Sequence, residues 1–302
     1  MKTHITKIYS FVRYSLPFLL LHPLWSNRGI SFSPLLRFSR LQLIFFFGIN
    51  ELCLPWLDSL ILPIRRGDVG LTGNYYTGLD EFRDMAFLLH LLRPDDTFVD
   101  IGANLGSYSL LASGICGSFS IAFEPVQGTY ARLVYNVKIN DLSLKTDLRP
   151  IALTDSKALE DADDLFFSTD RDSMNSFVDS AYCGSKSKLL FSTLDKQLDD
   201  VQPALVKIDV EGFESSVISG AVETLSSQHV LAVIAEGSST VVSDVLSSLG
   251  FIQIDYNARH RSVVLSPNNQ SHNKLWIKKS AYTVICDRLA SADYRLVYGC
   301  RI

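Results

Sequence analysis

A glycine-containing loop in the first half of the sequence suits the binding of a nucleotide-like ligand. The stretch FVDIGANLGSYSLLA, residues 98–112, begins with an apolar run, continues through Gly102, Asn104 and Gly106, and ends in a helix-like pattern. Glycine allows a tight turn and a close approach of a ligand to the backbone, and the amino end of a helix attracts anionic groups. The stretch therefore predicts a buried strand, a binding loop and the start of a helix.

Two carboxylates flank this loop and narrow the class of ligand. Glu124 ends the next expected strand, where it is placed to accept hydrogen bonds from two ribose hydroxyls. Asp100 precedes the turn, where it either faces a cationic group such as an amino-acid ammonium or holds the loop in place. The loop has neither the middle nor the last glycine of the dinucleotide pattern GxGxxG. Together these features favour S-adenosylmethionine over a nicotinamide dinucleotide.

A second group of charged residues lies in the stretch VKIDVEGFE, residues 206–214. Alternation along an extended strand places Lys207, Asp209 and Glu211 on the same side. One interpretation is structural, with Lys207 in an ion pair and Asp209 capping the following helix. The other is catalytic, with Asp209 or Glu211 accepting the proton of a substrate hydroxyl beside the methyl donor. Glu236, which ends the next strand, points to the same edge and is a further candidate.

The elements that must position these residues alternate between short apolar strands and amphipathic helices. Strands are expected at 98–101, 119–125, 148–153, 204–210, 231–236, 251–257 and 273–279, and helices at 79–93, 129–141, 214–225 and 240–250. This alternation predicts the α/β class with a doubly wound, Rossmann-like sheet. The acidic, polar stretch 158–180 interrupts the pattern and predicts a loop, either framing the substrate or solvated.

The first 65 residues are apolar and do not follow this alternation. A basic start and the run SLPFLLLHPLW imitate a signal peptide, but prolines interrupt the run and no cleavage site follows. The second apolar run, 41–64, is long enough to span a bilayer but carries polar residues in its interior. We interpret residues 1–65 as a helical extension packed on a domain at 66–302, with peripheral membrane contact through residues 1–60 as the alternative. One or two hairpins are expected at 61–78.

The composition excludes several classes of protein. A hydrophobic content of 47% is ordinary for a globular chain, and a net charge of −4 argues against a nucleic-acid partner. The five scattered cysteines form no CxxC pair, and the six histidines show no metal-ligand spacing, so we expect neither a disulfide framework nor a metal site. His260, within NARHRS, is either a contact for an anionic substrate or part of a solvated turn. These features favour a cytoplasmic protein, soluble or peripheral to the membrane.

Four stretches resemble successive motifs of the FkbM family of class I S-adenosylmethionine-dependent methyltransferases: FVDIGANLGSYSLLAS, FEPVQGTYARLVYNVKIND, STLDKQLDD and VKIDVEGFESSVISGA. The resemblance runs from about Asn74 to about Glu236. It implies a Rossmann-like methyltransferase sheet and methyl transfer to the oxygen of a sugar, a glycolipid head or a secondary metabolite such as a polyketide.

By the same matching, the cofactor-binding positions of the family fall on Asp100, Gly102, Asn104, Gly106 and Glu124. The family's DVEG element contains the two expected catalytic residues, Asp209 and Glu211. Two alternatives stay open at this point, namely a cofactor-binding or scaffold protein without turnover and a nicotinamide-dependent oxidoreductase.

Overall fold

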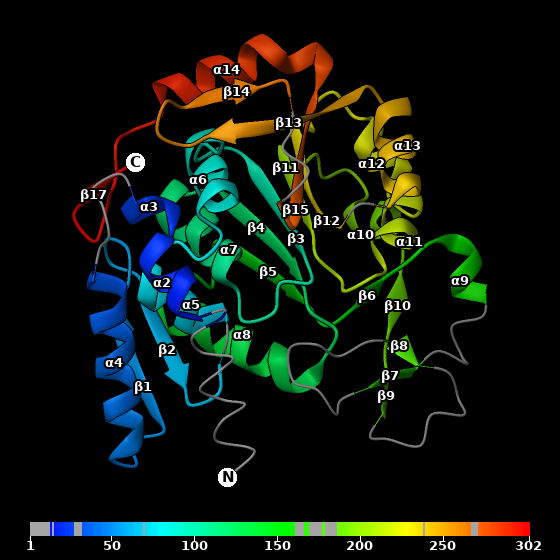
Figure 1. Cartoon of the computed structure of the whole chain (residues 1–302). Helices are drawn as coiled ribbons and strands as arrows, with labels where there is room; N and C mark the ends of the chain where they lie inside the picture. Colours follow the sequence, from blue (N-terminus) through cyan, green and yellow to red (C-terminus); the bar gives the residue numbers. More distant parts are fainter. Residues whose placement is uncertain are drawn as a thin grey trace. The chain divides into compact units, whose positions relative to one another are not determined.

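The chain forms two compact units in the computed structural model (Figure 1). The model describes residues 13, 15–26, 32–68, 70–160, 166–168, 177–178, 186–237, 239–266 and 271–302. The first unit combines Met1–Met85 with Tyr294–Ile302, and the second is Ala86–Asp293. The expected boundary between residues 65 and 66 falls inside the first of these units, and it stays a prediction.

The second unit is built on an eight-stranded sheet, ordered β14-β13-β15-β12-β11-β3-β4-β5. The five strands from β12 to β5 run parallel, and β13, β14 and β15 add antiparallel pairs at the other edge. The strands are β3 (Thr97–Ile101), β4 (Phe119–Phe123), β5 (Thr146–Arg149), β11 (Leu205–Ile208), β12 (Ala232–Glu236), β13 (Phe251–Asn257), β14 (Ser262–Val264) and β15 (Asn273–Lys278). The predicted mixed α/β class with a doubly wound sheet is confirmed.

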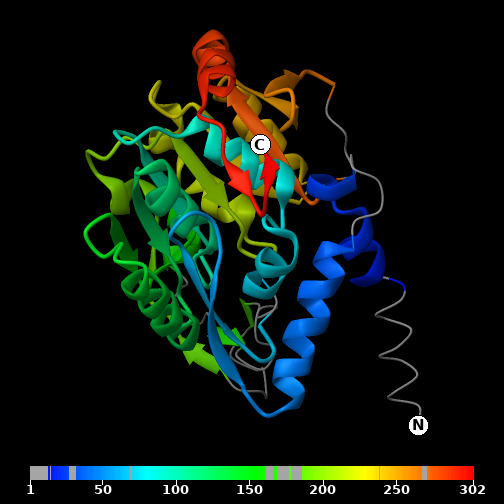
Figure 2. The same ribbon diagram turned by 90° about the vertical axis from the view of Figure 1, so that its left-hand side faces the viewer.

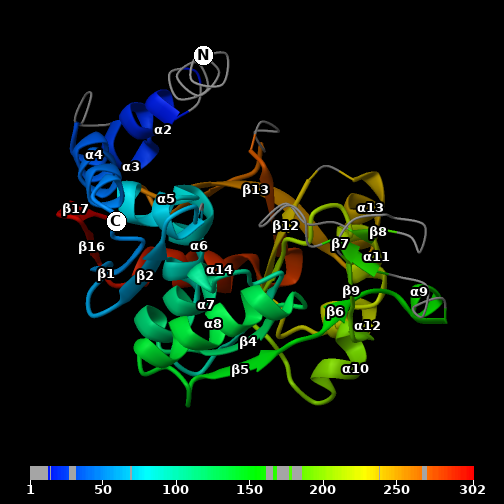
Figure 3. The same ribbon diagram turned by 90° about the horizontal axis from the view of Figure 1, so that it is seen from below.

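Helices cover both faces of this sheet (Figures 1 and 3). On one side lie α6 (Phe82–Leu91), α7 (Ser107–Leu110), which continues into a π-helical segment (Leu111–Cys116), and α8 (Gln127–Ile139). On the other side lie α10 (Leu194–Leu198), α11 (Glu214–Ser219), α12 (Val222–Ser226) and α13 (Thr240–Ser248). Helix α14 (Tyr282–Ser291) contacts β14 and β15.

The period of two along the strands decides which residues enter the main core. Val99, Ile101, Val206 and Ile208 join a buried cluster with apolar residues of α10–α13. Their neighbours Asp100 and Lys207 therefore project from the opposite face, the one that α7 covers. The two charged residues are direct partners in the register between β3 and β11.

Two expected elements are interrupted where the chain needs a close backbone contact or a turn. The expected helix 214–225 is broken into α11 and α12 at Gly220, where an added Cβ would lie 2.1 Å from the carbonyl oxygen of Thr154. The expected strand 148–153 is divided at Pro150, and its second part, β6 (Ala152–Leu153), pairs with β10 (Phe191–Ser192) instead. In both places tertiary contacts override the local pattern.

The stretch 158–180, expected as a loop, contains regular structure in its described part. Helix α9 (Ser156–Glu160) enters it, and β7 (Phe166–Ser168) and β8 (Phe177–Val178) form a small antiparallel sheet with β9 (Lys186–Lys188). The prediction of a loop is therefore wrong for these segments. The rest of the stretch, 161–165, 169–176 and 179–180, lies outside the described residues.

The first unit contains helices, as expected, and a hairpin whose first strand precedes the range 61–78 in which hairpins are expected. Its elements are α2 (Leu16–Leu21), α3 (Pro23–Ser26), α4 (Ser33–Phe46), β1 (Glu51–Pro55), β2 (Ile61–Arg65), α5 (Gly70–Thr77), β16 (Leu296–Val297) and β17 (Cys300–Arg301). Helix α4 is the long blue helix of Figure 2. The run 41–64, interpreted as packed helix, leaves the helix after Phe46 and forms the β1–β2 hairpin.

Helix α5 corrects the expectation of hairpins over 61–78, because only β2 belongs to one. Its glycine at position 73 leaves space for Asp80, whose carboxyl oxygen would lie 2.2 Å from an added Cβ. Within the described part of the chain, none of the helices combines the length and the apolar character that a membrane crossing requires.

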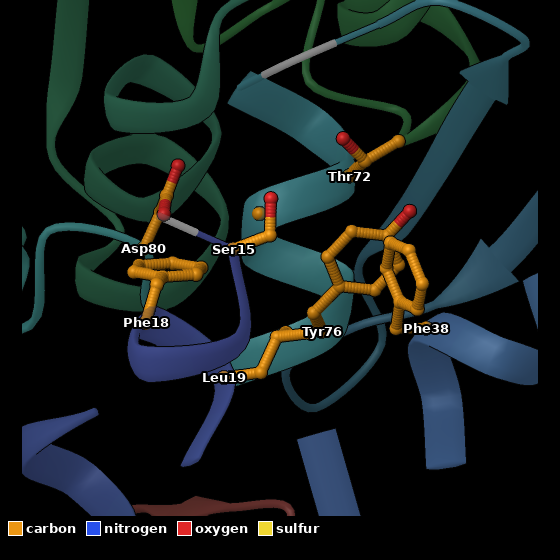
Figure 4. Close-up of a pocket in the computed structure, with 8 residues that line it drawn as sticks. Ser15, Phe18, Leu19, Phe38, Thr72, Tyr76 and Asp80 are labelled. Carbon is orange, nitrogen blue, oxygen red and sulfur yellow. The ribbon is translucent and has the colours of Figure 1, made fainter. Parts of the chain in front are cut away.

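A cavity of about 290 Å³ in the first unit is lined by aromatic and aliphatic side chains and by Asp80 (Figure 4). Its apolar lining includes Phe18, Leu19 and Phe38. Burial, with a smaller effect of Glu81, raises the pKa of Asp80 to about 7. A carboxyl group in such surroundings is more stable protonated than ionised.

Asp80→Asn should stabilise the first unit at high pH and leave it unchanged at low pH. The folded pKa lies above the unfolded value of about 3.9, so stability falls as the pH rises from about 4 to 7. We expect the variant to gain about 1–3 kcal/mol at pH 8 and nothing at pH 4. Urea unfolding followed by the fluorescence of Trp25 and Trp56, which lie in the same unit, measures it. An equal gain at both pH values contradicts the raised pKa.

Candidate active site

The candidate residues meet at the carboxyl edge of the parallel strands. Strands β3, β4, β11 and β12 end there at Ile101, Phe123, Ile208 and Glu236. The chain moves outward from β3 to β5 and then returns to β11 on the other side of β3. Ligands of open α/β sheets bind outside the carboxyl ends of the strands where the strand order reverses in this way. The topology therefore brings the glycine loop and the acidic stretch together.

The glycine loop lies directly against the end of β11. Gly102 has a φ of +76°, and an added Cβ would lie 1.8 Å from the carbonyl oxygen of Asp209. Gly106 has a φ of +88°, and an added Cβ would lie 2.5 Å from Leu133 of α8. Both positions need glycine, for the backbone angle and for space. The exposed Asn104 between them also adopts a positive φ, of 51°.

Glu124 connects the glycine loop to the end of β4. Its Oε2 accepts a hydrogen bond of 3.0 Å from the backbone N–H of Asn104, and its Oε1 accepts one of 2.9 Å from Val126. Burial raises the pKa of Glu124 to about 7, although these two hydrogen bonds act in the opposite direction. Each carboxylate oxygen offers two lone pairs, so each keeps capacity for one further donor.

Asp100 is buried beneath the loop and contacts protein groups. Its Oδ2 accepts a hydrogen bond of 2.7 Å from the hydroxyl of Ser109 in α7, and Oδ1 is buried without a partner among the described residues. Burial raises the pKa of Asp100 above its usual value, against the opposing effects of Lys207 and Ser109. Of the two roles expected for Asp100, the contacts favour that of holding the loop and the start of α7.

Lys207 and Asp209 form a largely buried ion pair at the end of β11. Nζ of Lys207 lies 2.6 Å from Oδ2 of Asp209 and 4.6 Å from the centre of the Tyr108 ring. Burial opposes the ionisation of Asp209, but Lys207 and a hydrogen bond from Glu236 outweigh it and lower the pKa of Asp209. The lysine is only 3% exposed, so the carboxylate is also needed to compensate its charge.

Glu236 and His272 extend this cluster toward solvent. Glu236 lies at the end of β12, opposite the first residue of β15, and its Oε1 is 2.5 Å from Nε2 of His272. Burial, followed by the hydrogen bond and the negative charge of Asp209, raises the pKa of Glu236 to about 8. The His272 side chain is 78% exposed. In the sequence, the only signal of His272 is its position just before the strand at 273–278.

The other two carboxylates of the acidic stretch have different surroundings. Glu211 is exposed, at a residue with a φ of 50°, and partial burial together with Asp209 raises its pKa. Glu214 is buried, and its Oε1 accepts hydrogen bonds of 3.3 and 3.0 Å from the backbone N–H groups of Val210 and Gly212. Glu214 therefore closes the turn before α11, while Glu211 is open to solvent.

His260 lies in the exposed turn between β13 and β14. Its backbone N–H donates a hydrogen bond of 3.1 Å to the side chain of Asn257, which shapes the turn. The neighbouring Arg261 is buried and donates to the carbonyl oxygens of Ala292 and Asp293. Among the described residues, no group of three or more His, Cys, Asp or Glu side chains is arranged to hold a metal ion.

Comparison with solved structures gives matches of low identity. A methyltransferase FkbM from Methylobacillus flagellatus KT is 14% identical over 69% of this chain and 53% of its own, with a TM-score of 0.42, so the chain spans about half the length of that protein. A precorrin-6y C5,15-methyltransferase from Geobacter metallireducens is 15% identical over 66% of this chain and 90% of its own, with a TM-score of 0.40. TrmK from M. capricolum, in complex with S-adenosyl-homocysteine, is 12% identical over 65% and 68%, with a TM-score of 0.36.

Comparison with curated proteins finds no match. The model of the methyltransferase FkbM domain, in contrast, matches residues 100–253, which is half of the chain. The matched segment begins at Asp100, includes the glycine loop, Glu124, the acidic stretch and Glu236, and ends in β13. On this match, the chain belongs to the FkbM methyltransferase family.

Proposed function

We propose that the protein transfers a methyl group from S-adenosylmethionine to a hydroxyl oxygen of a small-molecule or glycan acceptor. The observation that carries the proposal is the contact between Gly102 and the backbone of Asp209, which joins a ligand-binding loop to a cluster of proton-binding side chains. The net charge of −4 disfavours a nucleic-acid acceptor.

The residues around the loop fit this cofactor. The absence of a Cβ at Gly102 and Gly106 lets the loop pack against Asp209 and Leu133, which fixes the backbone that would contact the cofactor. Glu124 would hold the two ribose hydroxyls with the acceptor capacity that its backbone hydrogen bonds leave. Asp100 would keep α7 and the loop in position through Ser109. When bound, the cofactor supplies a methyl group on a positively charged sulfur and leaves as the neutral thioether.

The pair formed by Asp209 and Glu236 would accept the proton of the acceptor hydroxyl as its oxygen forms the new bond to the methyl carbon. Two carboxylates in contact titrate as a pair, and the raised pKa of Glu236 lies near neutral pH, where a general base is most effective. His272 then passes the proton from Glu236 to solvent, because it contacts Glu236 and is itself exposed.

Binding of the cofactor is the first test of this function. Calorimetry with the folded full-length protein should show saturable binding of S-adenosylmethionine and S-adenosyl-homocysteine, and the absence of both rejects the proposal. Titration with NADH, followed by its fluorescence, should show no specific binding. Cofactor binding without transfer to any compound in a metabolite screen with labelled methyl donor favours the alternative of a binding protein without turnover.

Glu124→Ala should weaken cofactor binding by about 1–3 kcal/mol, because it removes an acceptor for two hydroxyls and leaves the N–H of Asn104 without its partner. Calorimetric affinities for S-adenosyl-homocysteine measure the loss without any acceptor. Asp244→Ala, an exposed carboxylate of α13, is the matched control and should leave the affinity unchanged. Equal affinities of both variants would show that Glu124 serves only the loop.

A further inference from the structure

Helix α4 presents large apolar side chains to solvent along one side. The exposed large apolar residues of the helix and its two ends are Phe32 (60% exposed), Leu36 (68%), Leu43 (56%), Phe46 (80%) and Phe47 (73%). Their spacing of three, four and seven residues places them along one stripe of the helix. We refer to these five residues as the apolar face.

The apolar face is not needed for the core of the first unit. The same helix already buries Leu41 and Phe45, which are 0% and 5% exposed, and α4 contacts α2 and α5. Single exposed leucines are common on soluble proteins, but five large side chains concentrated on one helix and its two ends are not. Such a concentration marks a surface that another apolar phase covers.

The formal charge of residues 1–50 indicates what kind of apolar surface covers the apolar face. Residues 1–50 contain six basic residues, Lys2, Lys7, Arg13, Arg28, Arg37 and Arg40, and no Asp or Glu. Their formal charge is therefore +6, and because the whole chain carries −4, residues 51–302 carry −10. Aromatic and leucine side chains on one helix face, in a stretch of sequence whose charged side chains are all lysine or arginine, suit the boundary of a bilayer that contains anionic lipid.

We propose that the apolar face, which lies in a segment of formal charge +6, binds the protein to the surface of an anionic lipid bilayer. The helix lies along the interface, because its 14 residues extend only about 21 Å, less than the roughly 30 Å of the hydrocarbon core. Phe46 and Phe47, whose rings contact each other at the end of the helix, enter the boundary between head groups and acyl chains. This inference does not depend on the proposed methyl transfer.

A second copy of the chain fits the same surface less well. A symmetric dimer contact places the same patch on both partners, so two segments of charge +6 would face each other. Repulsion between like charges disfavours that arrangement, whereas anionic lipid neutralises it. The oligomeric state in solution therefore distinguishes a lipid bilayer from a second copy of the chain as the partner of the apolar face.

Sedimentation of the full-length protein with vesicles tests the proposal. We expect binding to vesicles of phosphatidylcholine with phosphatidylglycerol, at least tenfold weaker binding to phosphatidylcholine alone, and weaker binding at high salt. Replacing Leu43, Phe46 and Phe47 together by Ser should lower the affinity for the anionic vesicles at least tenfold. The matched control replaces Leu144, Leu190 and Leu265 of the second unit, which are 94%, 68% and 61% exposed, and should bind like the wild type.

Phe46→Trp provides a fluorescence measurement of membrane contact and preserves the helix and its apolar face. Its fluorescence should shift to the blue on addition of anionic vesicles and not on addition of neutral ones. Wild-type affinity in the triple serine variant, or no blue shift, overturns the proposal. A dimer of the wild type that becomes a monomer in the serine variant, without vesicle binding, overturns it in favour of self-association.

Discussion

Asp209→Asn is expected to lower the turnover number by about 10²–10⁴ while leaving the affinity for the cofactor nearly unchanged. Asparagine keeps the size of the side chain but can neither accept the proton nor balance the charge of Lys207, whose Nζ lies 2.6 Å from Oδ2. Single-turnover rates with labelled cofactor measure the chemical step, and calorimetry measures binding on the same preparation. A thermal melt shows whether the folded state has lost stability as well.

Glu236→Gln tests the pair of Asp209 and Glu236 through the pH dependence of the turnover rate. Below about pH 8 the wild-type Glu236 is mostly protonated, so the rate should rise with pH through that value and then level off. Glu236→Gln should lose most of its turnover, and its remaining rate should no longer rise with pH around 8. A pH profile in the variant that is as steep as in the wild type would show that another group titrates.

Glu211→Gln separates the two catalytic candidates that the sequence suggested. Glu211 is exposed, whereas Asp209 is tied to Lys207 and Glu236, so we expect Glu211→Gln to change turnover by no more than a few-fold. If Asp209→Asn and Glu211→Gln both keep full turnover and only unfold at a lower temperature, the acidic stretch serves only to form ion pairs at the end of β11. The general base is then another residue.

The sequence is sufficient to predict the parallel part of the sheet because each buried strand is an apolar run bounded by a turn. β3, β4, β11 and β12 lie where such runs occur. It is not sufficient where contacts between distant segments decide. No local pattern shows that Gly220 approaches Thr154 and breaks a helix, or that the apolar run after Phe46 forms a hairpin. Apolar character alone does not distinguish a buried helix from a buried hairpin.

In the candidate site, too, some positions follow from the local sequence and others depend on contacts between distant segments. Residues at the carboxyl ends of parallel strands or directly after them, such as Asp100, Glu124 and Asp209, meet at one edge because these ends point the same way. His272 directly precedes an antiparallel strand, so its approach to Glu236 depends on the pairing of β12 with β15, which the sequence does not reveal. The hydrogen bond that the buried Asp100 accepts likewise comes from a different element, because its donor Ser109 belongs to the following helix.

Gly102→Ala should disturb the loop and the strand end together. The new Cβ would lie 1.8 Å from the carbonyl oxygen of Asp209, a backbone atom that cannot turn away as a side chain can, and the φ of +76° adds strain for any L-residue. We expect a loss of about 3 kcal/mol or more in the free energy of unfolding and a fall of about a hundredfold or more in cofactor affinity.

Gly250→Ala is the control that separates the backbone strain of a positive φ from the steric clash of the added Cβ. Gly250 has nearly the same φ, +81°, but nothing lies within 4 Å of its added Cβ. Its substitution should therefore cost only about 1 kcal/mol and leave cofactor binding intact. The difference between the two variants, measured by urea unfolding and calorimetry, is the contribution of the contact between the glycine loop and Asp209. If the two variants lose the same stability and bind the cofactor equally well, that contact does not join the binding loop to the acidic cluster, and the two halves of the candidate site act independently.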